Sequence, residues 1–163
     1  MTEIASGTPV VTEMQVIPVA GYDSMLFNLC GAHAPYFTRN IVILKDSAGH
    51  TGIGEVPGGE GIRQALERSC GLVVGKSIGT YNSILNAIRQ TFVSGKAAHQ
   101  ATVHQVTSES EARVLKQPHE INLRMDNVIT AVEAALFDLL GQHLGVPVCE
   151  LLGAGKQRDA VRM

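Results

Sequence analysis

The strongest helical pattern in the chain lies between Asn127 and Leu144. Apolar residues recur there at steps of three and four, which places them on one side of a helix and predicts that this side packs on a large apolar surface. Asp126 or Asn127 is predicted to cap the first turn. Gly145 is predicted to take the left-handed conformation just past the last turn, because glycine has no Cβ to clash there.

The segment after this helix is VPVCELLGAGKQRDAVRM. Pro147 forbids continuation of the helix, and the segment predicts a second short helical turn, a glycine loop and the opening of a β-strand at residues 160–163. A chain that ends where a strand begins is expected to be the front portion of a longer protein.

The first third of the chain has the pattern of strands. Residues 10–19 are rich in β-branched residues, and Pro18 favours an edge position for this strand because proline cannot donate a hydrogen bond to a neighbour. Further strands are predicted at residues 23–29, 39–45 and 51–56. The continuous apolar run at residues 39–45 predicts that this strand is buried on both of its faces. Together they predict an antiparallel meander.

From Gly61 onward the hydrophobic period changes to that of helices. One helix is predicted over residues 62–74 and another between Gly79 and Gly95, each with apolar positions three or four apart. Residues 93–122 are polar and weakly periodic, which predicts a long surface loop. Strands followed by helices, without regular alternation, predict the α+β class.

Composition narrows the possible classes of protein. The chain has 163 residues, of which 45% are hydrophobic, enough for one sizeable core but not for two domains. Its net charge of −2 and its 13 dispersed basic residues argue against nucleic-acid binding. No apolar run is long enough for a membrane span, and the N-terminus does not resemble a signal peptide. Three widely spaced cysteines predict neither a disulfide framework nor a zinc site, which favours the cytoplasm.

The segment from Asn28 to Asn40, NLCGAHAPYFTRN, is the best candidate for ligand contact. We expect a loop in which Tyr36 and Phe37 close over a pocket while polar groups such as His33 orient a hydroxylated or anionic ligand. The alternative interpretation is that the two aromatic residues only anchor the loop and that His33 is solvated.

Other motifs predict no chemistry. The glycine-rich run at residues 52–61 does not have the GxGxxG spacing and is better interpreted as a strand exit and a tight turn. The histidines have no metal-like spacing, and His143 suits the C-terminal end of its helix. Glu133 and Asp138 are five apart on one helix and face different directions, so they do not form an acid–base pair. From the residues alone, the chain is a capping or binding module with no catalytic residues and no metal ligands.

Four stretches carry a resemblance to a known family. Residues 10–26, 28–67, 73–92 and 133–161 resemble the N-terminal part of the glucarate dehydratase group of the enolase superfamily, which is related to mandelate racemase and muconate lactonizing enzyme. The runs GAHAPYFTRN and GEVPGGE are long and unusual, which makes the resemblance specific to this group.

The resemblance implies a two-part lyase. Residues 1–125 would form a capping domain with an antiparallel meander and helices, and residues 126–163 the linking helix and the beginning of a (β/α) barrel of roughly 250 residues. In such enzymes the barrel supplies the base and the carboxylates that hold Mg²⁺, so the 163-residue chain is expected to be inactive by itself. The full-length protein is expected to be a homo-oligomer that dehydrates D-glucarate to 5-dehydro-4-deoxy-D-glucarate.

The resemblance also implies roles for individual residues. Asn28 and His33 match positions that hydrogen-bond the acid sugar, and Tyr36 and Phe37 become lid residues. Family members carry QTFDLR before the main helix, with a substrate-binding threonine, where this chain has HEINLR with Glu120 in place of the threonine. Because a carboxylate repels a dianion, either Glu120 points elsewhere or the substrate is a different acid sugar.

Two alternatives to the glucarate dehydratase hypothesis stay open. The first is an inactive stand-alone cap that binds a related barrel protein through the apolar side of the helix at residues 127–144. The second is a dehydratase of another acid sugar, as the substitution at Glu120 suggests.

Overall fold

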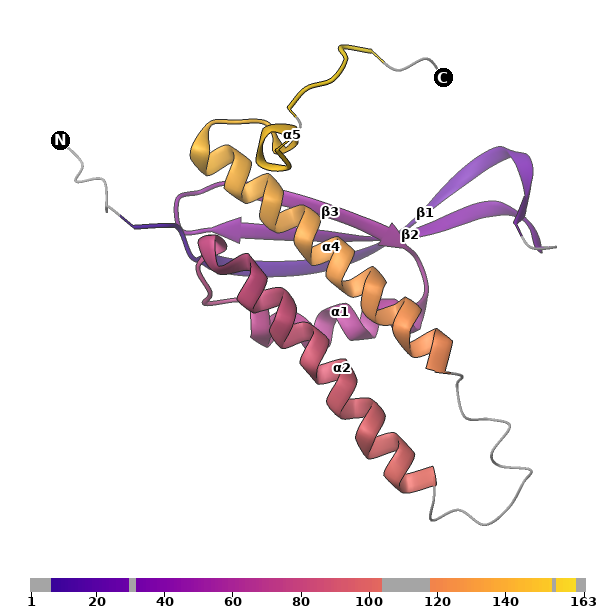
Figure 1. The fold of residues 1–163 in the computed structure, drawn as a ribbon. Helices are drawn as coiled ribbons and strands as arrows, with labels where there is room; N and C mark the ends of the chain where they lie inside the picture. Colours follow the sequence, from indigo (N-terminus) through magenta and orange to yellow (C-terminus); the bar gives the residue numbers. More distant parts are fainter. Residues whose placement is uncertain (1–6, 30–31, 104–117, 154, 161–163) are drawn as a thin grey trace.

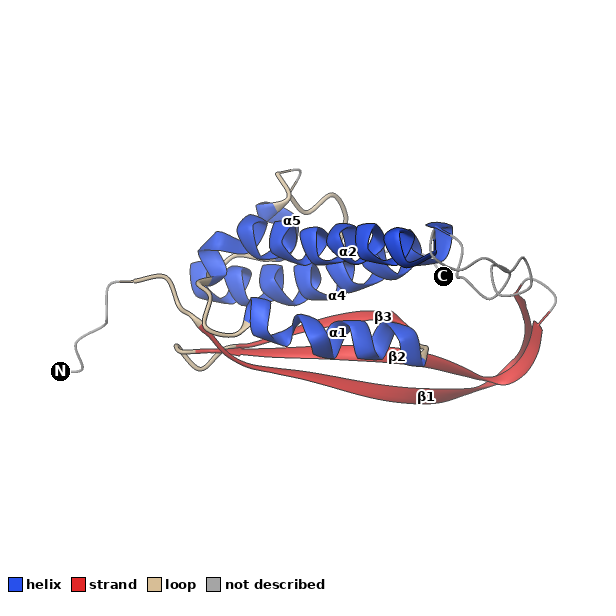
Figure 2. Cartoon of the chain, turned by 90° about the horizontal axis from the view of Figure 1, so that it is seen from below, coloured by secondary structure: helices blue, strands red, loops and turns tan. Residues whose placement is uncertain are grey.

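The chain folds into a three-stranded antiparallel sheet covered on one face by helices (Figures 1 and 2). The computed structural model describes residues 7–29, 32–103, 118–153 and 155–160, and for residues 23–29, 32–35, 94–103 and 118–123 it describes the backbone alone. The strands are β1 (Val11–Leu29), β2 (Ala32–Asp46) and β3 (Thr51–Pro57), in the order β1-β2-β3. The helices are α1 (Glu60–Val73), a short 3-10 turn η1 (Ile78–Thr80), α2 (Tyr81–Val103), α4 (Pro118–Leu144) and α5 (Val148–Leu151).

The first two predicted strands are one strand. β1 runs without a break through residues 20–22, and only a register irregularity between Tyr22 and Phe27 marks the expected boundary. The predicted edge position of the strand that holds Pro18 is confirmed, because β1 is the outer strand of the sheet. The loop predicted from Asn28 to Asn40 is wrong for its described residues: residues 28–29 lie on β1 and residues 32–40 on β2, and the two strands pair as far as Leu29 with Ala32. Residues 30–31 lie outside the described part.

Burial alternates along the sheet because one face carries the helices and the other does not. Val42, Leu44 and Val56 point toward the helices and are buried. On the opposite face Ile53 is 54% exposed, and Ile41 and Ile43 are only half-buried. The prediction that the central strand is buried on both faces is therefore wrong, since no described element covers the second face (Figure 2).

The predicted helices are present, and two of them are longer than their apolar patterns. α1 agrees with its prediction, α2 extends to Val103, and α4 begins at Pro118, so Asp126 and Asn127 lie inside the helix and do not cap it. The surface loop predicted at residues 93–122 is wrong at both of its ends; residues 104–117 lie outside the described part.

The end of the chain follows the prediction as far as it is described. Gly145 has a φ of 70°, as expected for the residue that ends α4, and α5 is the predicted short turn. Ala160 is not in a strand, and the remaining residues of the predicted strand, 161–163, lie outside the described residues. α4 is continuous across residue 125, and the division into residues 1–125 and 126–163 stays a prediction.

α4 lies across the sheet with its backbone almost in contact with β3. A Cβ added at Gly52 would lie 2.2 Å from the carbonyl oxygen of Ala135, and one added at Gly54 would lie 1.9 Å from that of Ala131. The glycines therefore let the helix approach closely. This packing buries most of the apolar side of α4, including Val128, Val132, Ala135, Leu136 and Leu139.

This burial corrects one of the alternatives drawn from the sequence. The stand-alone cap was expected to bind its partner through the apolar side of the helix at residues 127–144, but the sheet and the other helices already cover that side.

Within the described residues, no helix is long and apolar enough to cross a membrane.

Candidate functional site

The sheet extends into a two-stranded arm where β3 ends. The last pair between β2 and β3 joins Arg39 to Pro57. Among the described strands, only β1 and β2 continue beyond it, and we call their residues 20–29 and 32–38 the arm. Figure 1 shows the arm projecting away from the helices and bending along its length. A two-stranded ribbon is marginally stable by itself, so the arm depends on contacts at its base.

The two polar residues singled out in the sequence occupy neighbouring positions on this arm. Asn28 pairs directly with His33 across the two strands, one pair before the end of the hairpin, where Leu29 pairs with Ala32. They are five positions apart in the chain, and the hairpin register places their backbones side by side. The side chains of both residues lie outside the described part, so their contact with a ligand stays a prediction.

The two predicted lid residues lie on opposite faces of the arm. Tyr36 pairs with Tyr22 in register, and their rings meet edge to face with centroids 5.4 Å apart. Phe37 pairs with Gly21, and consecutive residues of a strand point to opposite faces. A ligand on one face of the arm can therefore meet Tyr36 or Phe37, but not both.

Phe37 lies between a glycine and an arginine. A Cβ at Gly21 would lie 2.3 Å from the ring's Cζ, so the ring lies directly on the glycine. The guanidinium of Arg39 lies 5.3 Å from the ring centroid, and its Nε is 2.9 Å from a carboxylate oxygen of Glu55 on β3. These contacts join the arm to the three-stranded part of the sheet.

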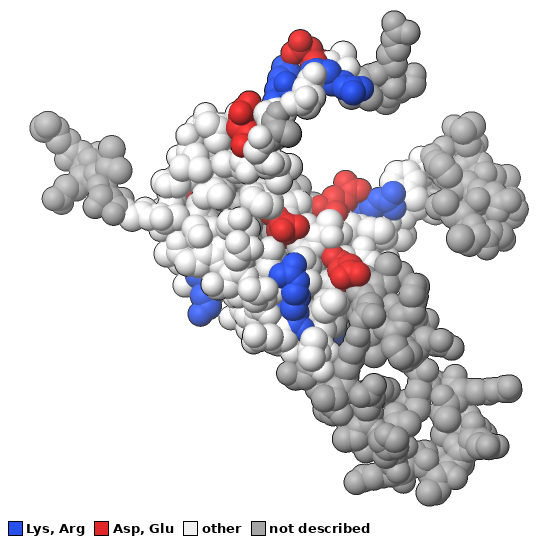
Figure 3. Space-filling model, in the orientation of Figure 1, with Lys and Arg blue, Asp and Glu red and all other residues white. Residues whose placement is uncertain are grey.

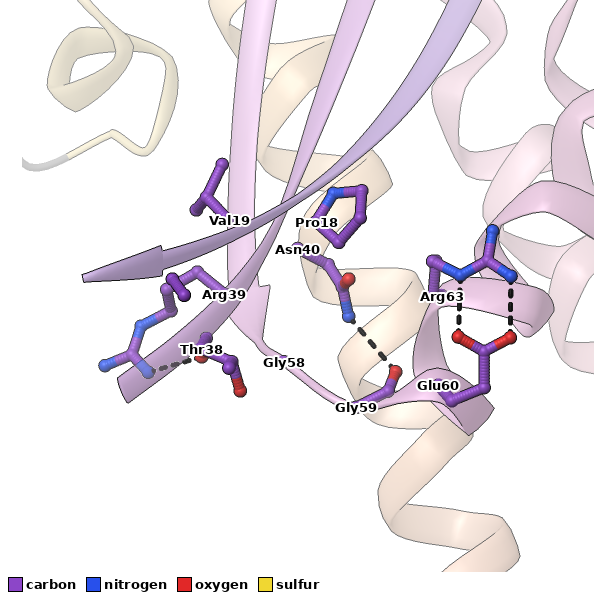
Figure 4. Close-up of a pocket in the computed structure, with 10 residues that line it drawn as sticks. Pro18, Val19, Thr38, Arg39, Asn40, Gly58, Gly59, Glu60 and Arg63 are labelled. Atoms are coloured by element: carbon purple, nitrogen blue, oxygen red, sulfur yellow. Dashed lines mark hydrogen bonds and ion pairs between the residues drawn. The ribbon is translucent and has the colours of Figure 1, made fainter. Parts of the chain in front are cut away.

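A depression of about 350 Å³ lies at the base of the arm (Figure 4). It is lined by β1, β2, the turn between β3 and α1, and the first turn of α1. The lining residues are Pro18, Val19, Ala20, Thr38, Arg39, Asn40, Gly58, Gly59, Glu60 and Arg63. Asn40 is 1% exposed, and its amide donates to the carbonyls of Pro57 and Gly59 at 3.3 and 3.4 Å. These bonds tie the turn after β3 to the central strand.

The charged groups of this depression are already paired. Arg63 forms a two-pronged ion pair with Glu60, with nitrogen–oxygen distances of 2.6 and 2.8 Å, and a second ion pair with Glu67. Hydrogen bonds from Arg63 and then Gln64 lower the pKa of Glu60 to about 2. Because the N–H groups of the Arg63 guanidinium already donate to these carboxylates, we do not expect Arg63 to bind an anionic ligand in the depression.

A second polar cluster lies at the β2–β3 turn. The buried carboxylate of Asp46 accepts hydrogen bonds from the backbone of Ala48 and His50, and His50 Nδ1 lies 2.9 Å from its second oxygen. Burial raises the pKa of Asp46, but the hydrogen bonds of His50 and Ala48 outweigh it, so this pKa lies below its usual value. The ring of His143, in the last turn of α4, lies edge to face with that of His50. The cluster stabilises the β2–β3 turn, and none of its residues lines the depression at the base of the arm.

Among the other candidate residues from the sequence, Asp138 has a structural role, and the side chain of Glu120 is not described. Asp138 accepts the backbone N–H of Ile53 at 3.0 Å. Glu120 lies in the first turn of α4 and its side chain is outside the described part. Within the described residues, no group of three or more His, Cys, Asp or Glu side chains is placed to hold a metal ion.

Charges are mixed on the face that carries the helices. Basic and acidic side chains alternate there and do not gather by sign (Figure 3). This distribution does not test the prediction that the chain does not bind nucleic acid. Cys70 and Cys149 are both free thiols.

The contacts around Phe37 could not be found from the sequence. The sequence did not indicate that Gly21 contacts the Phe37 ring, because a single glycine between two predicted strands suggests a turn. The pairing of Arg63 with Glu60 and Glu67 follows the three- and four-residue spacing of helical ion pairs, which could have identified it.

Comparison with known proteins gives a consistent group of relatives. No protein-family model matches the chain. A probable glucarate dehydratase from Streptomyces coelicolor is 30% identical over 151 residues, which make up 93% of this chain and 33% of that protein. An enolase from Mycobacterium smegmatis crystallised with tartrate superposes with a TM-score of 0.72 at 28% identity, over 96% of this chain and 33% of that one. An enolase from Pseudomonas fluorescens with bound magnesium, potassium and tartrate superposes with a TM-score of 0.71 at 25% identity, over 94% and 33%.

These matches confirm the predicted fold class. An antiparallel three-stranded sheet followed by helices is the N-terminal capping fold of the enolase superfamily. The chain spans about a third of the length of the relatives that it matches.

Proposed function

We propose that this chain, whose fold is that of the N-terminal capping domain of the enolase superfamily, recognises the substrate of a glucarate dehydratase-like lyase. The observation that carries the proposal is the 30% identity to a probable glucarate dehydratase over 93% of the chain. The reaction would be the dehydration of D-glucarate to 5-dehydro-4-deoxy-D-glucarate. The chain would contribute recognition, with the catalytic residues in the barrel part that the family resemblance implies.

The arm is the proposed recognition element. Asn28 and His33 are register neighbours near its end, so one ligand can meet both positions. An amide and an imidazole together offer donors and acceptors, which a sugar diacid with several hydroxyl groups requires when it leaves water. The mixed polar character of the pair suits such a ligand better than an apolar one.

Magnesium is proposed for the whole enzyme but not for this chain. The Pseudomonas fluorescens enolase was crystallised with bound magnesium. The described residues do not fit such an ion, because no three acidic, histidine or cysteine side chains converge among them. We therefore assign the proposed Mg²⁺ site to the barrel part and derive no step through it here.

An affinity measurement on the isolated chain tests the proposal. We expect D-glucarate to bind and its neutral counterpart D-glucitol not to bind, because the carboxylates distinguish them. Asn28→Ala and His33→Ala should each weaken D-glucarate binding about tenfold, as expected for the loss of one hydrogen bond to a charged ligand. Equal binding of the two sugars, or unchanged affinity in both variants, would exclude the proposed role of the arm.

An activity measurement separates recognition from catalysis. With D-glucarate and Mg²⁺, the isolated chain should form no keto-acid product, because the barrel residues are absent from it. Turnover by the pure chain would show that the proposed division of labour is wrong.

A different acid sugar is the second candidate substrate. Both solved neighbours were crystallised with tartrate, a smaller hydroxylated diacid. Glu120 also replaces the threonine of the family pattern. Tighter binding of tartrate than of D-glucarate in the same affinity measurement would favour this candidate.

A further inference from the structure

We propose that Phe37 is a positioning residue, which fixes the direction of the arm through its contacts with Gly21 and Arg39. The inference rests on the proposed function, in that the arm carries Asn28 and His33. The arm needs such a device because it is a two-stranded ribbon, and within the described part of the chain no third strand pairs with it beyond Arg39.

The geometry at the base of the arm supports this role. The ring of Phe37 lies on Gly21, with three of its atoms between 2.3 and 2.8 Å from the position of a Cβ there. No other residue type at position 21 leaves room for the ring in this place. The ring therefore crosses from β2 to β1 and holds the two strands together on this face.

Arg39 connects the ring to the rest of the sheet. Its guanidinium covers the ring at 5.3 Å, within the range of a cation–π contact, and pairs with Glu55 on β3. Arg39 also donates to the backbone carbonyl of Thr38 at 3.0 Å. The chain of contacts runs from Gly21 through Phe37 and Arg39 to Glu55, so a displacement of the arm would have to break it.

The partial exposure of Phe37 supports a positioning role over a core role. Its side chain is 40% exposed, and it is not a member of the main hydrophobic core. Removal of the ring should therefore loosen the arm while the core stays folded. Tyr22 and Tyr36 meet on the opposite face and give the arm a second contact, which keeps its strands paired when Phe37 is changed.

Amide hydrogen exchange on the full chain tests this inference without any ligand. In Phe37→Ala and Gly21→Ala, the amides of residues 22–29 and 32–36 should exchange about fivefold faster, the change expected for one aromatic contact. The amides of residues 41–45 in the core should keep their rates. Ile53→Ala, which removes an exposed side chain from the same face of β3, is the matched control and should change neither set.

Affinity for D-glucarate then tests the link to recognition. Phe37→Ala should weaken binding about fivefold at unchanged core stability, and Phe37→Tyr, which keeps the ring, should restore it. Unchanged exchange of the arm in both ring-displacing variants would overturn the inference. If the arm loosens as expected but the wild-type chain binds no D-glucarate, the proposed function fails and the positioning role of Phe37 stands.

Discussion

Two glycines of β3 decide how closely α4 approaches the sheet. At Gly54 a Cβ would lie 1.9 Å from the Ala131 carbonyl oxygen, and backbone cannot move aside as a flexible side chain can. Gly54→Ala is therefore expected to lower the free energy of unfolding by about 3 kcal/mol, at the upper end for an overpacked core. Chemical denaturation of the purified variant measures this loss.

Gly71→Ala is the matched control for this substitution. Gly71 lies in the exposed part of α1, and a Cβ there meets nothing within 4 Å. Because glycine is unfavourable inside helices, this variant should be more stable by about 0.5–1 kcal/mol. Equal effects of the two substitutions would contradict the close approach of α4 to β3.

Asp46 makes stability depend on pH in the acidic range. Its folded-state pKa lies below the unfolded value of about 3.9, so its ionised form stabilises the fold above that pH. This stabilisation is lost as the pH falls through the lower, folded-state pKa. We expect Asp46→Asn to be less stable than the wild type at pH 7, with a difference that shrinks as the pH falls below about 4. Urea denaturation across this range checks it, and a difference that stays constant would contradict the assignment.

The residues proposed to contact the ligand were the hardest to assign from the sequence alone. Asn28 and His33 have no spacing that marks a site, and only the family resemblance selects them. Their pairing depends on a hairpin register that also includes an irregularity between Tyr22 and Phe27. Such an irregularity is not visible in a hydrophobic pattern, because it changes the pairing without changing the composition.

At the scale of elements, α4 protects the outer edge of β3. Asp138 accepts the backbone N–H of Ile53 at 3.0 Å, and the side chain of Gln142 donates to the carbonyl oxygen of Thr51 at 2.7 Å. These groups satisfy polar backbone atoms that an edge strand otherwise presents to other chains. The helix thus covers the sheet and also closes one edge of it.

Removal of this edge contact should have a local effect. Asp138→Ala is expected to lower the free energy of unfolding by about 1 kcal/mol and to accelerate hydrogen exchange at the Ile53 amide. Asp126→Ala changes an exposed acidic residue of the same helix and serves as the control. Unaltered exchange at Ile53 in the Asp138 variant would show that the contact does not protect the edge.

The elements were predictable to different degrees for physical reasons. α1, α2 and α4 bury one side each, so their apolar periods identify them, although polar first and last turns hid their full length. Residues 32–38, the β2 half of the arm, were predicted as a loop because their alanines and polar residues give no regular alternation. Its strands are held by pairing between segments and by contacts such as that of Tyr22 with Tyr36, which no single segment reveals.

At the scale of the molecule, one hydrophobic core joins the sheet to the helices. Buried residues of β1, β2, β3, α1, α2 and α4 form a single cluster, represented by Val11, Leu44, Val56, Leu66, Ile88 and Leu136. We expect the isolated chain to unfold in one cooperative transition, because no element has a core of its own. Coincident thermal transitions by far-ultraviolet circular dichroism and by tyrosine fluorescence check this, and two separated transitions would contradict it.

The arm lies outside this core, which suits a recognition element. It projects from the end of the sheet away from the helices (Figure 1), where a ligand can reach it without disturbing the packing of α4. The chain spans about a third of its relatives, and the proposed function assigns the chemistry to the part that it does not span.

The amide chemical shifts of the labelled chain during a titration with D-glucarate test this account most directly. The account predicts saturable shifts at residues 22–36, which surround Asn28 and His33, with the amides of the core and of the depression near Arg63 unchanged. Shifts centred on that depression, or an absence of any saturable shift at the arm, would contradict it.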